Sequence, residues 1–73
     1  MLESRTERAR YAFVVKEFER GTPWLALEAI DKVLPVLSKG FIGFDLRPGT
    51  TVNEAKRFAD LLNDTITTTS YTT

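Results

Sequence analysis

The side chains that most enzymes use as general bases and nucleophiles are missing from this chain. It contains no histidine and no cysteine, which removes the commonest general base, the thiolate nucleophile and zinc sites built from these ligands. A carboxylate pair, Asp60 and Asp64, falls near the end of an expected helix, where the helix dipole disfavours negative charge. We therefore expect no catalytic residue, no metal and no cofactor, and a protein that is not an enzyme.

A turn that leads into a helix is a candidate anion-binding site. Residues 47–51 read Arg-Pro-Gly-Thr-Thr, so an arginine, two hydroxyls and free amides meet at the expected start of a helix. The pattern matches neither the P-loop nor the dinucleotide-binding motif. Turn and cap chemistry explains the same residues without a ligand, because Pro48 and Gly49 form a turn and Thr51 caps the helix. The weak anion site predicted here consists of Arg47, Gly49, Thr50 and Thr51.

A cluster of arginines near the N-terminus is a candidate for contact with nucleic acid. It comprises Arg5, Arg8 and Arg10. Glu3 and Glu7 interleave with them, and alternating signs are typical of a solvated helix face. Ten basic and ten acidic residues cancel over the whole chain. Because both nucleic acids and membrane surfaces attract a basic field, we expect neither as a general partner.

The length of the chain limits the core that can position any of these residues. At 73 residues there is room for one domain, spanning residues 1–73. A chain of this size buries roughly 60–65% of its unfolded surface, so its stability needs support. Without cysteine or histidine, the support that remains is oligomerisation. No segment approaches 18 consecutive apolar residues, the N-terminus is polar, and the lack of cysteine fits a reducing compartment, so we expect a cytoplasmic protein.

Two helices are expected in the N-terminal half. Residues 4–7 read as a capping box, and Gly21 is well placed to end a helix that starts there. The apolar stripe of this helix has spacing i, i+3, i+4, i+7 and consists of Tyr11, Val14, Val15 and Phe18. Phe13 lies nearly opposite that stripe, with Ala9 beside it, so the helix has a second apolar face.

Thr22 and Pro23 are typical of a second helix start. Its apolar stripe consists of Trp24, Leu27, Ile30, Leu34 and Leu37. At Pro35 the helix either stops near Leu34 or kinks and continues to Lys39, and we favour an end near Leu34 followed by a loose turn. The short connection at Gly21 then predicts an antiparallel helical hairpin.

A strand, a helix and a strand are expected in the C-terminal half. Alternation over residues 41–47 predicts a strand. Thr51 and Glu54 form a second capping box, which starts a helix over residues 52–62 that Asn63 ends. Its predicted buried stripe is Val52, Ala55, Phe58, Ala59 and Leu62. Residues 66–72 are rich in threonine and favour a final strand. The two strands are either parallel neighbours or sit apart with a partner strand between or beside them.

The expected fold is therefore a small two-layer α+β domain, with an N-terminal helical hairpin followed by a β-α-β unit, in the order α-α-β-α-β. Two strands make a poor sheet alone, and the final strand carries neither charge nor proline that would protect its edge. Apolar and edge residues without an assigned partner form a weak candidate interface between copies of the chain: Ala9, Phe13, Phe41, Thr69 and Tyr71.

The sequence favours a small non-enzymatic protein-interaction module whose partner is a second copy of itself. The alternative is a small regulatory domain that binds an anionic ligand at residues 49–51. A third possibility is weak nucleic-acid binding through the first helix.

Overall fold

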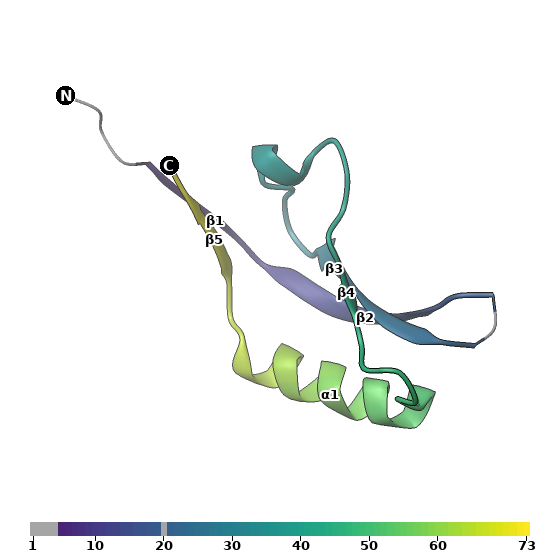
Figure 1. The fold of residues 1–73 in the computed structure, drawn as a ribbon. Coiled ribbons are helices and arrows are strands. Elements are labelled where there is room, and N and C mark those ends of the chain that lie inside the picture. Colours follow the sequence, from purple (N-terminus) through teal and green to yellow (C-terminus); the bar gives the residue numbers. More distant parts are fainter. Residues whose placement is uncertain (1–4, 20) are drawn as a thin grey trace.

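The computed structural model describes residues 5–19 and 21–73, which are mostly sheet, with five strands and one α-helix near the C-terminus. In chain order the elements are β1 (Thr6–Ala9), β2 (Tyr11–Glu17), β3 (Pro23–Ala29), the 3₁₀ helix η1 (Pro35–Leu37), β4 (Gly43–Asp45), α1 (Val52–Thr65) and β5 (Thr69–Thr72). The molecule is elongated, 49 × 24 × 21 Å. Strands β1 and β5 form an arm that extends away from α1 (Figure 1).

Strands β1 and β2 form one almost continuous strand, interrupted at Arg10, and this strand has partners on both of its edges. β1 pairs with β5, whereas β2 pairs with β3, which in turn pairs with β4; all three pairings are antiparallel. The Thr73 amide donates to the Arg5 carbonyl, so odd-numbered residues bond toward β5. The Ile30 amide donates to the Arg10 carbonyl, so even-numbered residues bond toward β3. The β5 and β3 partners therefore lie on opposite sides of the same strand.

Asn63 of α1 occupies part of the β2 edge that β3 leaves open. Its Oδ1 accepts a hydrogen bond from the Phe13 amide at 2.7 Å, and its Nδ2 donates to the Phe13 carbonyl at 3.0 Å. Both backbone groups of an odd-numbered residue are satisfied in this way, as a neighbouring strand would satisfy them. The helix lies close to the sheet, because its two buried residues, Ala55 and Ala59, are small.

One face of the β2–β3–β4 sheet carries the core. Leu25 on this face is 1% exposed, and its register partners are Val15 on β2 and Phe44 on β4. The ring centroids of Phe13 and Phe44 lie 5.8 Å apart. Toward the arm, Leu34 is buried in a cluster with Ala9, Tyr11 and Leu27, and its amide donates to the Tyr11 hydroxyl at 2.9 Å. Residues before η1 thus complete the core that α1 does not reach.

The opposite face of the sheet carries an ion pair and an aromatic stack. Lys16 and Glu28 pair at 3.0 Å, and each side chain is about half exposed, so this face is turned away from α1. The Phe18 ring stacks on Trp24 with centroids 5.6 Å apart. Trp24 in turn lies across Gly43, where a Cβ atom would come within 2.8 Å of the indole ring. Glycine at this position lets the tryptophan ring lie against the backbone of β4.

The predicted N-terminal helical hairpin is wrong, because both segments are strands. The segment expected as the first helix forms β1 and β2, and the one expected as the second forms β3. The proposed cap at Ser4 and the helix end at Arg20 lie outside the described residues. Both proposed ends of the second helix, at Leu34 and at Lys39, are also wrong. The chain leaves β3 at Ala29, and Pro35 instead starts η1.

The physical reason for this error is that residues 11–17 are apolar on both faces. Val14 and Val15 fit a helical stripe with Tyr11, but Tyr11, Phe13 and Val15 also alternate with the period of a strand. Aromatic and β-branched residues favour the strand. Gly21 has a positive φ of 74°, but it serves the turn between β2 and β3, in which its amide donates to the Phe18 carbonyl.

The local signals of the C-terminal half are confirmed, with changes in detail. Gly49 has a φ of 90° in the turn, and Thr51 and Glu54 form the capping box of α1. The helix continues past the predicted end at Asn63 to Thr65, and Phe58 is 46% exposed instead of buried. The predicted strands shorten to β4 and β5.

These two strands do not form a β-α-β unit in one sheet. β4 pairs with β3 and β5 pairs with β1, each in an antiparallel manner, so they are not neighbours. The α-α-β-α-β order is replaced by four strands, the helix and a final strand.

The Asn63 contact predicts a measurable loss of stability. Replacing Asn63 with alanine removes two hydrogen bonds to Phe13 and should lower the free energy of unfolding by about 1–2 kcal/mol. Urea denaturation with an unchanged m value would measure it. Asn53→Ala, on the exposed first turn of the same helix, is the control. Equal losses in the two variants would contradict the role assigned to Asn63.

The Trp24–Gly43 contact gives a second prediction. Gly43→Ala should lower the free energy of unfolding by about 1–2 kcal/mol, because the new methyl group displaces the indole ring. In the matched variant Gly40→Ala, a Cβ atom would meet nothing within 4 Å, and the change should be much smaller. Thermal or urea unfolding compares the two, and a Gly43→Ala variant as stable as Gly40→Ala would refute the contact.

Candidate functional site

The five residues of the predicted interface between copies do not form one surface. Ala9 is 3% exposed and belongs to the core, and Phe13 is half-buried against it. Phe41 is 79% exposed and lies in the loop before β4. Thr69 and Tyr71 lie on β5, where Thr69 is the register partner of Ala9. The structure therefore leaves Phe41 and the residues of β5 as candidates for surface contact.

The outer edge of β5 presents backbone groups that its partner β1 does not use. Tyr71 and Thr73 bond toward β1, because odd-numbered residues form the hydrogen-bonded pairs of this ladder. The hydroxyls of Thr6 and Thr72 lie 2.9 Å apart, as expected for the closer, non-hydrogen-bonded pairs. The amides and carbonyls of Ser70 and Thr72 consequently point to the outside of the sheet.

The sequence of β5 and its flanks contains nothing that protects this edge. No charged residue and no proline occurs from Thr65 to Thr73. Natural sheets usually block open edges with lysine, proline or bulges, because an unpaired edge recruits another strand. This part of the site could be predicted from sequence, since both the strand and its lack of charge are visible there.

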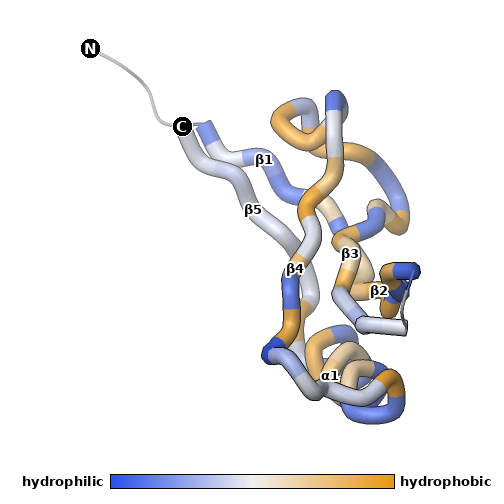
Figure 2. Tube along the Cα trace, turned by 45° about the vertical axis from the view of Figure 1, so that its right-hand side comes forward, coloured by the Kyte–Doolittle hydropathy of each residue, from blue (hydrophilic) through white to orange (hydrophobic). Residues whose placement is uncertain are grey.

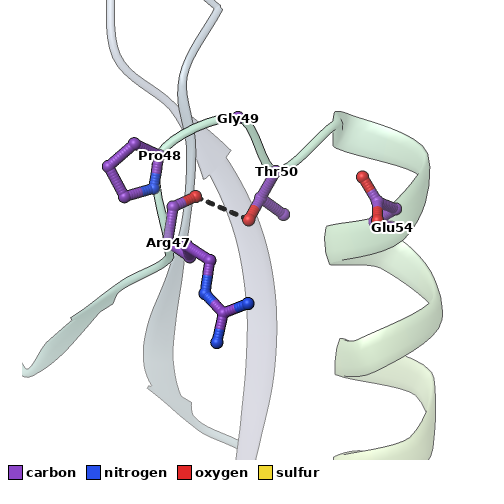
Figure 3. Close-up of a pocket in the computed structure, with 5 residues that line it drawn as sticks. All are labelled: Arg47, Pro48, Gly49, Thr50 and Glu54. Carbon is purple, nitrogen blue, oxygen red and sulfur yellow. Dashed lines mark hydrogen bonds between the residues drawn. The ribbon is translucent and has the colours of Figure 1, made fainter.

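The residues of the predicted anion site lie together at the start of α1. Arg47, Pro48, Gly49, Thr50 and Glu54 line one open hollow (Figure 3). The Thr50 hydroxyl donates to the Arg47 carbonyl at 2.6 Å, and the Arg47 side chain extends away from the turn. The structure thus brings the predicted residues together but adds an acidic side chain that the prediction did not include.

Glu54 takes up hydrogen-bond donors that an anion would need. Its Oε1 accepts from both the amide and the hydroxyl of Thr51, each at 3.0 Å. The Glu54 amide donates back to the Thr51 hydroxyl at 3.1 Å. The hydrogen bond from the Thr51 amide, then that from its hydroxyl, holds the pKa of Glu54 below its usual value. The helix start therefore already holds a carboxylate of the chain itself.

The arginine cluster lies on and beside β1 instead of on a helix. Arg8 is exposed on β1. Arg10 pairs with Asp31, with 3.5 Å between Nε and Oδ2, and its amide donates to the same carboxylate. The hydrogen bond from the Arg10 backbone is the main reason that the pKa of Asp31 is lowered. Arg10 thus helps to fix the start of the loop that follows β3.

That loop, residues 30–42, holds a group of exposed apolar side chains, of which only Phe41 is a candidate from sequence. Figure 2 shows the loop around η1 largely in orange, in contrast to the paler and bluer arm. Its exposed members are Ile30, Val33, Val36, Phe41 and Ile42. Sequence reasoning assigned part of this segment to the buried stripe of a helix, and no signal other than the density of apolar residues would have identified the loop.

Within the described residues, no group of three or more acidic, cysteine or histidine side chains is placed to hold a metal ion. No helix in this part of the chain is long and apolar enough to cross a membrane. Comparisons with protein-family models, with curated proteins and with solved structures found no match.

The lowered pKa of Glu54 predicts that the protein loses stability as the pH falls into the acid range. Because the folded-state pKa lies below the unfolded one, the stabilisation is present above the unfolded value and is lost as the pH falls through the folded value. The melting temperature should therefore fall between about pH 5 and pH 3. Glu54→Gln should make that fall shallower, and adding Asp31→Asn should make it shallower still. Identical slopes in wild type and variants would contradict this.

Proposed function

We propose that this chain is a non-enzymatic interaction module that associates with a second copy of itself through the outer edge of β5. The observation that carries the proposal is the open, uncharged edge at Ser70 and Thr72. A two-stranded ribbon such as β1–β5 is marginally stable alone, and three or more strands are needed for independent stability. Pairing between two β5 strands would join two arms into one four-stranded sheet.

The geometry of an antiparallel pair favours one register for this contact. If Ser70 of each copy lies opposite Thr72 of the other, the outward amides and carbonyls of both residues form a hydrogen-bonded pair. Tyr71 then faces its own counterpart at the closer, non-hydrogen-bonded position, where side chains make contact. Tyr71 is 40% exposed, so its ring has surface to bury there. No charge in β5 opposes a symmetric contact.

Self-association is better supported than anion binding at residues 49–51. The hydroxyls of Thr50 and Thr51 already donate to groups of the chain, and the carboxylate of Glu54 lies in the hollow. A second anion would have to displace this carboxylate or accept its repulsion. Nucleic-acid binding is less supported for a similar reason, because Arg10 is already paired with Asp31.

The test compares two substitutions at one residue. Ser70→Pro removes an outward amide that β1 does not use, so the arm should persist while the contact between copies is lost. Ser70→Ala keeps the amide and is the matched control. Sedimentation velocity over a range of concentrations should show a dimer for wild type and Ser70→Ala, and a monomer for Ser70→Pro.

The integrity of the arm is checked separately by amide hydrogen exchange. Protection of the Tyr71 amide, which bonds toward β1, should remain in Ser70→Pro. A wild-type protein that stays monomeric at high concentration would refute the proposal. A Ser70→Pro dimer as stable as wild type would refute the β5 edge as the contact.

A further inference from the structure

The loop between β3 and β4 exposes more apolar surface than its role as a connection requires. Leu34 anchors it to the core through the cluster with Tyr11. The side chains of the loop patch, defined as Ile30, Val33, Val36, Phe41 and Ile42, remain exposed. Exposed apolar patches of a folded domain typically mark an interaction site. Phe41, at 79%, is the most exposed of the large apolar side chains in the described residues.

The loop carries two positive charges that no acidic side chain pairs with among the described residues. Lys32 and Lys39 are exposed and have no ion-pair partner among the described residues. The one acidic residue of the loop, Asp31, is held by Arg10. The zero net charge of the whole chain does not oppose a local attraction, since charges act over a Debye length of about 8–10 Å. The same loop therefore offers exposed apolar side chains and two unpaired lysines.

The position of this loop makes it accessible to an extended surface such as a membrane. The loop and η1 project from a part of the sheet that lies away from α1 (Figure 1). A projecting group of apolar side chains can enter the boundary between headgroups and acyl chains, while lysines reach the headgroups with their amines. Anionic lipids add about 1 kcal/mol per basic residue near the surface, which corresponds to about five-fold in affinity.

We propose that residues 30–42 attach this protein to membrane surfaces that contain anionic phospholipids, with Phe41 entering the interface and with Lys32 and Lys39 contacting the headgroups. This contact is peripheral and uses a surface separate from the β5 edge. It does not depend on self-association.

The test is co-sedimentation of the 73-residue chain with vesicles of two compositions. One is phosphatidylcholine alone and the other contains phosphatidylserine at about a third of the lipid. We expect binding to the anionic vesicles that weakens strongly when the salt concentration is raised from about 0.1 M to about 0.5 M. Binding to phosphatidylcholine alone should be much weaker.

Two pairs of variants separate the loop from other exposed residues. Phe41→Ser should weaken binding by about ten-fold or more, whereas Phe58→Ser, on α1, should leave it unchanged. The double variant Lys32→Gln/Lys39→Gln should weaken binding by about 25-fold, and Lys56→Gln on α1 should have little effect. Circular dichroism checks that each variant is folded, and these substitutions all lie at exposed positions.

The outcomes distinguish the loop from general adhesion. No binding to anionic vesicles at low salt would overturn the proposal. Equal losses in Phe41→Ser and Phe58→Ser would overturn it as well, because the apolar contact would not belong to the loop. The proposal would also be overturned if the lysine substitutions did not change binding. The same holds if the loop bound an acidic protein and no vesicle.

Discussion

The two directions of backbone hydrogen bonding along residues 5–18 set the arrangement of the rest of the molecule. An extended strand presents the amides and carbonyls of alternate residues to opposite sides. In this protein the odd-numbered groups meet β5 and then Asn63, and the even-numbered groups meet β3. The chain after β4 must therefore pass from one edge of the sheet to the other, and α1 makes this crossing. Asn63 lies in the last turns of α1 and holds this end of the helix against β2, because its side chain bonds to the backbone of Phe13.

The parts of this fold that could be predicted from sequence are those fixed by neighbouring residues. Thr51 and Glu54 stand three residues apart, and the turn at Gly49 needs a positive φ, so the start of α1 is decided locally. Whether residues 11–17 form a helix or a strand is not decided by neighbouring residues. Their apolar residues satisfy a helical and a strand period alike, and the choice depends on pairing with residues 23–29. Neighbouring residues are enough to predict a helix cap or a turn, whereas a strand in a sheet is predicted only together with the strand that it pairs with.

The same distinction applies to the candidate sites. Thr69 and Tyr71 could be identified because an uncharged, threonine-rich strand is recognisable by itself. Ala9 and Phe13 would form a separate surface only on a helix, and as strand residues they face the core. The turn at residues 47–50 is predicted correctly from sequence. The predicted anion site omits Glu54, whose carboxylate lies in the hollow because it accepts a hydrogen bond from the Thr51 amide. Of the apolar loop, sequence identifies only Phe41, because a helix that ends near Leu34 would bury Ile30 in its stripe.

Because β1 and β5 join residues near the two ends of the described chain, their pairing has a consequence for the order of folding. Thr6 pairs with Thr72, so this ladder closes a loop that contains nearly the whole domain. The β2–β3 hairpin closes through a few residues at Gly21 and pays far less chain entropy. The hairpin and the helix are thus expected to form first and the arm last. By the same reasoning the arm opens before the rest, as a separate cooperative unit of low stability.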